Sequence, residues 1–287
     1  MPSLRDIQRK ITSVKKTQQI TSAMKMVAAA KLRRAQERVI AARPYARKML
    51  AVIANLATSA ERVQHPLLAK REPNRVTLLV LTSDRGLCGA YNTSILRHAV
   101  ETIKQFQAEG KDVTVDIVGR KARDFFRKRE YKLGKVWMGL GTIGYETAAP
   151  IGQYVVEQFI ASETDDVYLL YNEFKSVITQ KVTLEKLLPV EPPEESDPFM
   201  RAVDYLYEPS AEAILGSILP KHIEVQVYRS LLESQASEVG ARMTAMDSAT
   251  RNAKDMIGRL TLKFNKTRQA MITKEISEIV GGAEALK

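Results

Sequence analysis

The stretch LESQASEVGARMTAMDSATRNAKDMIGRLTLKF, residues 232–264, decides the architecture of this chain. Its apolar residues recur at steps of three and four, the spacing found on the contact face of a helix that winds around a partner helix. We therefore predict a coiled-coil strand here. Its contact face would consist of Leu232, Ala236, Val239, Met243, Met246, Ala249, Ala253, Met256, Leu260 and Phe264.

Residues on either side of this stretch predict where the helix begins and ends. Ser210 has the side chain of an N-cap, and Glu212 in the first turn would favour the positive end of the helix dipole. Pro220 predicts a kink after a short first helix that ends near Leu219, with a long helix continuing from there. Gly281 predicts the end of that long helix near residue 280. At about 1.5 Å per residue the long part alone would span roughly 90 Å, so we expect it to project from the rest of the chain.

A second coiled-coil strand of about 54 residues is predicted at the N-terminus. Ser3 and Asp6 form a capping-box pattern at its start, and Pro44 should bend it without ending it. Between the apolar runs, Thr17, Gln18 and Thr21 indicate either a tolerated polar layer or a change of register. The predicted contact face consists of Ile7, Ile11, Val14, Ile20, Met24, Val27, Leu32, Ala35, Val39, Ala42, Ala46, Met49, Ile53 and Leu56.

Composition separates the two ends of the chain from its centre. Of the 18 aromatic residues, all but Tyr45, Tyr228 and Phe264 lie within residues 61–208, where a globular core would need them. Residues 1–60 carry thirteen Lys and Arg but two acidic residues, which accounts for the whole net charge of +11. We therefore predict an N-terminal helix over 1–60, a central domain over 61–208 and a C-terminal helix over 209–287.

The central domain alternates apolar strands with helical segments, which predicts a mostly parallel sheet with helices on its faces. Residues 65–75 would form a linker before it, and residues 189–198, rich in proline and acidic residues, an exposed loop after it. Strands are expected at 76–81, 113–118, 132–136, 166–174 and 177–188, and helices at 90–108, 121–129 and 147–162. The predicted fold class is α/β, with a Rossmann-like central domain and a long antiparallel coiled coil made by the terminal helices.

Antiparallel pairing of the terminal helices leaves the C-terminal helix longer by about 18 residues, or roughly 27 Å. The extra segment carries Met271, Ile272, Ile276, Ile279 and Val280, apolar residues that would have no partner in this chain. Exposed apolar surface of this kind marks an interaction site, so we expect other proteins to surround this tip.

Several classes of protein are disfavoured by residue content. Cys88 is the single cysteine, so no disulfide framework exists within the chain, and with His65, His98 and His222 it forms no zinc-binding pattern. There is no run of eighteen apolar residues and no apolar signal segment at the N-terminus. We expect a cytosolic or peripheral protein that needs no metal or cofactor.

Two other functions remain open on the residues alone. The turn SDRGLCGAYN, residues 83–92, follows a strand and opens a helix, as a nucleotide-binding turn would, although its glycine spacing fits no standard phosphate loop. A nucleophilic Cys88 would belong to such an enzyme, but a buried packing role suits it better. The basic first helix could bind nucleic acid, yet its cations lie all round the helix and only Tyr45 could stack on a base.

Three segments in this order resemble the gamma subunit of F-type ATP synthase across essentially the whole chain. They are SLRDIQRKITSVKKTQQITSAMKMVAAAKLRRAQ from Ser3, SDRGLCGAYN from Ser83 and FNKTRQAMITKEISEIVGGAEAL from Phe264. The resemblance implies a non-catalytic rotor shaft that couples proton-driven rotation of the c-ring to ATP synthesis or hydrolysis. Its partners would be the hexamer of alpha and beta subunits, the epsilon subunit and the c-ring, with no nucleic acid and no insertion into the membrane.

The resemblance also implies roles for particular residues. Arg268, Gln269 and Thr273 match positions that hydrogen-bond a loop of the beta subunit, and Met24 with Lys25 matches the neck that faces an acidic beta-subunit loop. Tyr207 and Glu208 match positions of the foot near the c-ring and the epsilon subunit. The apolar tip formed by Ile272, Ile276, Ile279 and Val280 would turn inside the hexamer as in a bearing. The absence of a transit segment favours a bacterial enzyme, placed on the cytoplasmic face of the cell membrane.

Overall fold

The computed structural model describes residues 3–59, 65–191 and 210–284, and its contacts group them into two compact units. One unit combines the chain up to Ala29 with the chain from Arg242 onward, and the other runs from Ala30 to Ala241. Helices α1 (Leu4–Ser59) and α5 (Ala211–Glu284) each contribute to both units. The three-part division at residues 60 and 208 stays a prediction.

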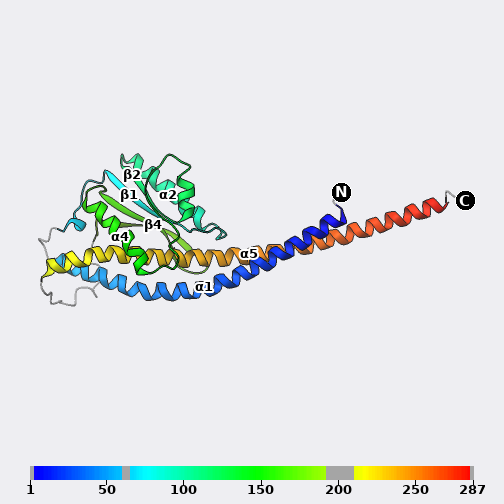
Figure 1. The fold of residues 1–287 in the computed structure, drawn as a ribbon, viewed down its shortest axis with the longest axis horizontal. Helices are drawn as coiled ribbons and strands as arrows, with labels where there is room; N and C mark the ends of the chain where they lie inside the picture. The colour runs from blue at the N-terminus through cyan, green and yellow to red at the C-terminus, as the bar shows by residue number, and fades with distance from the viewer. Residues whose placement is uncertain (1–2, 60–64, 192–209, 285–287) are drawn as a thin grey trace. The chain divides into compact units, whose positions relative to one another are not determined.

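The second unit contains a single five-stranded sheet in the order β3-β2-β1-β4-β5 (Figure 1). All neighbouring strands are parallel except β5, which runs antiparallel to β4. The predicted mostly parallel α/β centre is therefore confirmed, and the predicted element boundaries differ by no more than three residues from those observed. The strands are β1 (Arg75–Leu81), β2 (Asp112–Val118), β3 (Lys132–Trp137), β4 (Asp166–Phe174) and β5 (Gln180–Leu188); the helices are α2 (Tyr91–Ala108), α3 (Arg120–Phe126), α4 (Tyr145–Ile160) and a 3₁₀ turn at Pro66–Leu68.

Helices cover both faces of this sheet. Ile95 and Ile103 of α2 and Phe126 of α3 are fully buried against Val80 and Ile117 of the strands, which forms the main core. The opposite face is covered by α4 and by the neighbouring α5, whose Glu233 and Ser237 side chains bond directly to β4. Gly152 permits this packing, because a Cβ at that position would come within 2.7 Å of the Glu224 Cα on α5.

Helix α5 begins at Ala211 and continues through Pro220 as one helix, so the separate short helix predicted before the proline is not observed, while the predicted kink stays a prediction. A proline inside a helix removes one hydrogen bond and costs about 3 kcal/mol. Leu215, Leu219 and Ile223 are fully buried on one face of this segment. Each contributes about 1.5–3 kcal/mol, so their burial offsets the lost bond and the helix persists.

The contact face of α1 in the first unit follows a stricter repeat than we predicted. Ile20 is 60% exposed and Val27 is also exposed, whereas Thr21 is only 8% exposed and Ala28 is buried. Ile7, Val14, Thr21 and Ala28 are spaced by seven residues, which is the repeat of a left-handed coiled coil. Following apolar residues alone shifted the predicted face by one position, because the buried residue at position 21 is polar.

The same correction applies to α5. Met256 is 51% exposed, while Met246 and Ala253 are buried at a spacing of seven, with the partly buried Thr250 between them and the partly buried Ile257 four residues after Ala253. Met256 therefore lies beside the contact face rather than in it, and Ala249 in that face stays a prediction. Small and polar side chains occupy the contact face in this part of the helix pair. An apolar repeat alone therefore does not identify that face, and the position of the partner helix is needed.

The helix starts agree with the predictions and the end of α5 does not. The Ala213 N–H donates to the Ser210 Oγ at 3.2 Å, and the Asp6 N–H donates to the Ser3 Oγ while the Ser3 N–H donates to the Asp6 carboxylate. Both N-caps are confirmed. Gly281 does not end α5, which continues to Glu284.

Candidate functional site

The paired helix ends of the first unit form the candidate site. The Thr21 and Thr250 hydroxyls are 2.8 Å apart, and the Lys25 ammonium lies 2.5 Å from the Asp247 carboxylate. These two contacts show that the helices are antiparallel, because residue numbers increase along α1 in the direction in which they decrease along α5. The hydrogen bond from Lys25 lowers the pKa of the Asp247 carboxyl, so this carboxyl is ionised at neutral pH.

The two predicted neck residues lie next to this polar layer. Met24 is half-buried, and the Lys25 side chain remains 44% exposed although its ammonium binds Asp247. An acidic partner of Lys25 would therefore compete with Asp247. The contact predicted for these residues with an acidic beta-subunit loop stays a prediction.

The register shows where α5 loses its partner. Thr21 lies beside Thr250, so the first helical residue of α1, Leu4, lies seventeen residues further along α5, near Thr267. Beyond that point α5 has no helical partner among the described residues of this unit. Arg268, Gln269 and Thr273 are all exposed in this segment.

The unpaired segment carries a second apolar stripe. The five apolar residues predicted for the tip are between 44% and 71% exposed. Three of them, Ile272, Ile276 and Ile279, continue at steps of four and three to Ala283 and, in the other direction, to Gln269. At about 100° per residue this stripe lies roughly a third of a turn from the face that contacts α1. It therefore lies to the side of the face that contacts the partner helix and is exposed.

This second stripe was missed in the sequence, although its spacing was visible there. The tip residues are apolar in the sequence, and the signal that identifies the stripe is their repeat at steps of three and four together with its rotation from the first contact face. The rotation matters because it places Gln269, one of the predicted contact residues, on the same face as Ile272 and Ile276.

A groove with a volume of about 730 Å³ lies on the paired part of α1 and α5 in the first unit. Met256, which we had assigned to the contact face, lines this groove instead. Its walls combine apolar, cationic and acidic side chains: Lys10, Ser13, Val14, Asn252, Asp255, Met256, Arg259 and Leu260.

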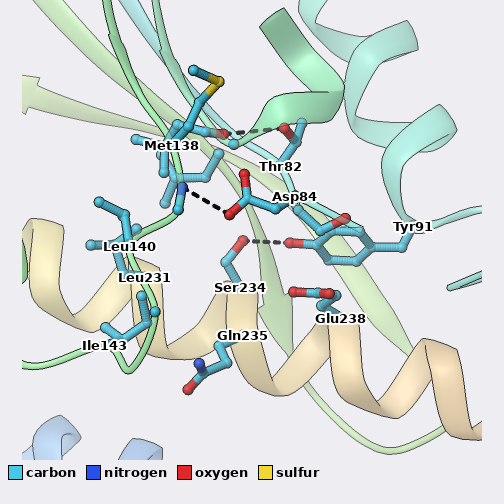
Figure 2. A pocket seen from close by; sticks show the side chains of 16 residues that line it. Thr82, Asp84, Tyr91, Met138, Leu140, Ile143, Leu231, Ser234, Gln235 and Glu238 are labelled. Atoms are coloured by element: carbon cyan, nitrogen blue, oxygen red, sulfur yellow. Dashed lines mark hydrogen bonds between the residues drawn. The ribbon is translucent and has the colours of Figure 1, made fainter. Parts of the chain in front are cut away.

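The turn at residues 83–92 lies at the carboxyl ends of the parallel strands, beside a small pocket (Figure 2). The Asp84 carboxylate accepts hydrogen bonds from the Arg120 N–H at 2.9 Å and the Gly139 N–H at 3.0 Å, so it ties three loops together. Ligand pockets usually measure about 300–1,000 Å³. This pocket measures about 100 Å³ and has a carboxylate at its wall, so it does not suit a nucleotide phosphate.

Cys88 and Tyr91 of this turn also have structural partners. Cys88 is buried and its sulfur accepts from the Asn92 side-chain amide at 3.1 Å. Tyr91 is buried with its hydroxyl 2.7 Å from that of Ser234 on α5 (Figure 2), and burial raises the Tyr91 pKa. The turn therefore fastens α2 to α5 and does not form a catalytic centre.

The described residues contain no cluster of His, Cys, Asp or Glu that could hold a metal ion. Within the same residues, no helix is both long and apolar enough to span a bilayer. Tyr207 and Glu208, the predicted foot contacts, lie outside the described residues.

Comparison with known proteins identifies the chain's relatives. The family described as ATP synthase matches residues 3–286. The ATP synthase gamma chain of Pelotomaculum thermopropionicum is 54% identical and that of Geobacter metallireducens 52% identical, with each alignment covering the whole of both chains.

Solved structures agree with this relationship. The central stalk and c-ring structure of the Tetrahymena thermophila mitochondrial ATP synthase contains a chain with 28% identity and a TM-score of 0.61, covering 80% of this chain and 99% of that one. A rotor chain of the Euglena gracilis mitochondrial ATP synthase has a TM-score of 0.66 over 94% of this chain and 98% of that one; at 22% identity it shows the shared fold. This chain therefore belongs to the ATP synthase gamma-chain family, whose members are non-catalytic subunits of the enzyme.

Proposed function

We propose that this chain is the central rotor shaft that couples rotation of a c-ring to ATP synthesis or hydrolysis at a hexamer of alpha and beta subunits. The observation that carries the proposal is the end of α5, which outruns α1 and carries an exposed apolar stripe. Such a stripe on an unpaired helix needs surrounding protein, and a sleeve made by the hexamer meets that need.

The remaining partners follow from the same role. We assign Arg268, Gln269 and Thr273 to a contact with a beta-subunit loop, supported by their exposure next to the apolar stripe. Met24 and Lys25 would face an acidic beta-subunit loop, and Tyr207 with Glu208 would meet the c-ring and the epsilon subunit. The exposed cations Arg5, Arg9, Lys15 and Lys16 form no ion pair with another described residue, which leaves them available to acidic loops.

Rotation would act on the catalytic sites through shape and charge. The shaft presents a different face to each beta subunit, so its angle determines which of the three sites favours binding and which favours release. Proton flow that turns the c-ring would drive ATP release, and ATP hydrolysis would drive the reverse rotation. The complex would sit peripherally on the cytoplasmic face of a bacterial membrane.

Reconstitution tests the proposal. Mixing the chain with its alpha and beta subunits should yield a stable complex whose ATP hydrolysis exceeds that of either component. A chain that lacks residues 271–287 should keep its folded sheet but bind the hexamer more weakly. If the full chain forms no complex by native mass spectrometry, the rotor assignment fails.

A further inference from the structure

In the second unit, a fully buried carboxylate joins the helix pair to the sheet. Glu233 of α5 is 1% exposed. Its carboxylate accepts two hydrogen bonds from the Arg43 guanidinium of α1, at 2.8 and 3.0 Å, and a third from the Phe174 N–H at 3.0 Å. Phe174 is the last residue of β4, so one carboxylate holds two helices and the end of a strand.

Arg43 completes this arrangement. Besides binding Glu233, its guanidinium donates to the Phe174 carbonyl oxygen at 3.0 Å. Both backbone polar groups of Phe174 are therefore bonded to the ion pair. The hydrogen bond with Glu233 raises the Arg43 pKa, which keeps the guanidinium charged. We call these contacts the Arg43–Glu233–Phe174 network.

Other polar contacts join α5 to the sheet on the same side. The Arg229 guanidinium binds the Glu185 carboxylate at 2.6 and 2.7 Å, and the Ser237 hydroxyl donates to the Asn172 carbonyl at 2.9 Å. Leu232 and Ala236 of α5 are buried as well, and their sequence spacing predicts them on the face toward α1. The helix therefore meets the sheet through directional bonds, and it meets α1 through the directional Arg43–Glu233 pair in addition to apolar side chains.

Directional bonds matter for a part that must transmit torque. Apolar packing is non-directional, so a helix can slide or turn against it at modest cost. Charge-assisted hydrogen bonds depend on angle and distance, and a planar guanidinium with two fixed partners resists rotation. A buried ion pair is often no more stabilising than apolar residues of similar volume, so its retention here points to a positioning role.

We propose that the Arg43–Glu233–Phe174 network is the torque-bearing joint between the sheet domain and the helix pair. It fixes the angle of α1 and α5 against β4, so that force applied to the sheet domain turns the helices instead of slipping past them. This inference rests on the proposed rotor function, and it goes further by naming the positioning residues through which torque enters the shaft.

The experiment measures how freely the sheet domain twists when the helix ends are held. The complex with alpha and beta subunits is fixed to a surface, and a probe is attached through Lys128→Cys, an exposed position; Cys88 is buried and stays unlabelled. The thermal variance of the probe angle is inversely proportional to the stiffness of the chain. The test variant is Arg43→Met with Glu233→Leu, and the control removes the exposed Arg33–Glu37 pair of the same helix through Arg33→Ala with Glu37→Ala.

We expect at least a doubling of the angular variance in the Arg43→Met, Glu233→Leu variant, with ATP hydrolysis close to that of the parent chain. Its melting temperature should be lower, because the buried Phe174 N–H and carbonyl lose their partners. The control should match the parent in all three measurements. Unchanged variance in the folded test variant would overturn the joint. If that variant does not fold, Arg43→Lys replaces it, because it keeps the positive charge but not the planar guanidinium. A raised angular variance in Arg43→Lys supports the joint, and an unchanged angular variance overturns it.

This assay distinguishes a failure of the proposed rotor function from a failure of the proposed joint. A parent chain that does not bind the hexamer overturns the rotor function and the joint with it. A parent complex that rotates normally, together with variants of unchanged variance, overturns the joint alone.

Discussion

His222 provides a test of how α5 is held in the second unit. Its ring is buried on α5, and its Nδ1 has no hydrogen-bond partner among the described residues. Burial lowers the His222 pKa from 6.5 to about 4, with a smaller contribution from Arg229 that Glu185 opposes. Protonation would place an unpaired charge beneath the sheet, so acid should loosen this region.

The sign and size of the effect follow from linkage. The folded-state pKa lies below the unfolded-state pKa, so the unfolded chain binds this proton more tightly. The stabilisation is complete above about pH 6.5 and is lost as the pH falls toward 4. At pH 5 the loss relative to pH 7 amounts to about 2 kcal/mol.

Asp116 acts in the opposite direction over the same range. Burial raises its pKa to about 6, against a hydrogen bond from the Lys135 N–H that lowers it. Its folded-state pKa exceeds the unfolded value, so protonation below pH 6 stabilises the fold by about 1 kcal/mol at pH 5. The parent chain should therefore lose only about 1 kcal/mol between pH 7 and pH 5, and Asp116→Asn should lose about 2 kcal/mol.

Urea unfolding at pH 7, 6 and 5 measures these differences. Trp137 is the single tryptophan and lies in β3, so its fluorescence reports on the sheet-containing unit. His222→Gln should remove the acid-induced loss, while His98→Gln at an exposed position should follow the parent curve. Parallel pH curves for the parent chain and His222→Gln would refute the assignment of the loss to His222.

Three further predictions concern the tip, a strand end and the small pocket. Ile276→Asp should leave the melting temperature of the isolated chain unchanged, because the side chain is already exposed, but it should weaken binding to the hexamer. Ser277→Asp is the matched control at a neighbouring exposed position. Equal binding by the two variants would contradict the role of the apolar stripe. Gly119→Ala should lower the free energy of unfolding by about 3 kcal/mol, because φ is +99° and the added Cβ would lie 2.2 Å from the Thr82 carbonyl oxygen. Gly110→Ala is the control, since its added Cβ meets no atom. A smaller loss for Gly119→Ala than for Gly110→Ala would disprove the clash. Millimolar ATP or ADP should not change the melting temperature of the isolated chain, since the pocket at the strand ends holds only about 100 Å³, and a rise of several degrees would restore the nucleotide-binding alternative.

Local sequence patterns determined much of this architecture. Steps of three and four residues identified both terminal helices, since that spacing is imposed by helix geometry in any surroundings. Short apolar runs between helical segments predicted all five strands, and Ser3, Asp6 and Ser210 predicted the helix starts through bonds to residues three positions away. Each of these signals depends on residues only a few positions apart, so each can be predicted from the sequence alone.

The tertiary structure decided what depends on distant residues. Thr21 enters the contact face because Thr250 meets its hydroxyl, and α5 passes through Pro220 because its apolar neighbours are buried. Glu233 reads as an ordinary surface charge until Arg43 and Phe174, far away in the chain, are brought to it. These features depend on which side chains meet across long sequence separations, and that information appears only when the sheet and the two helices are assembled.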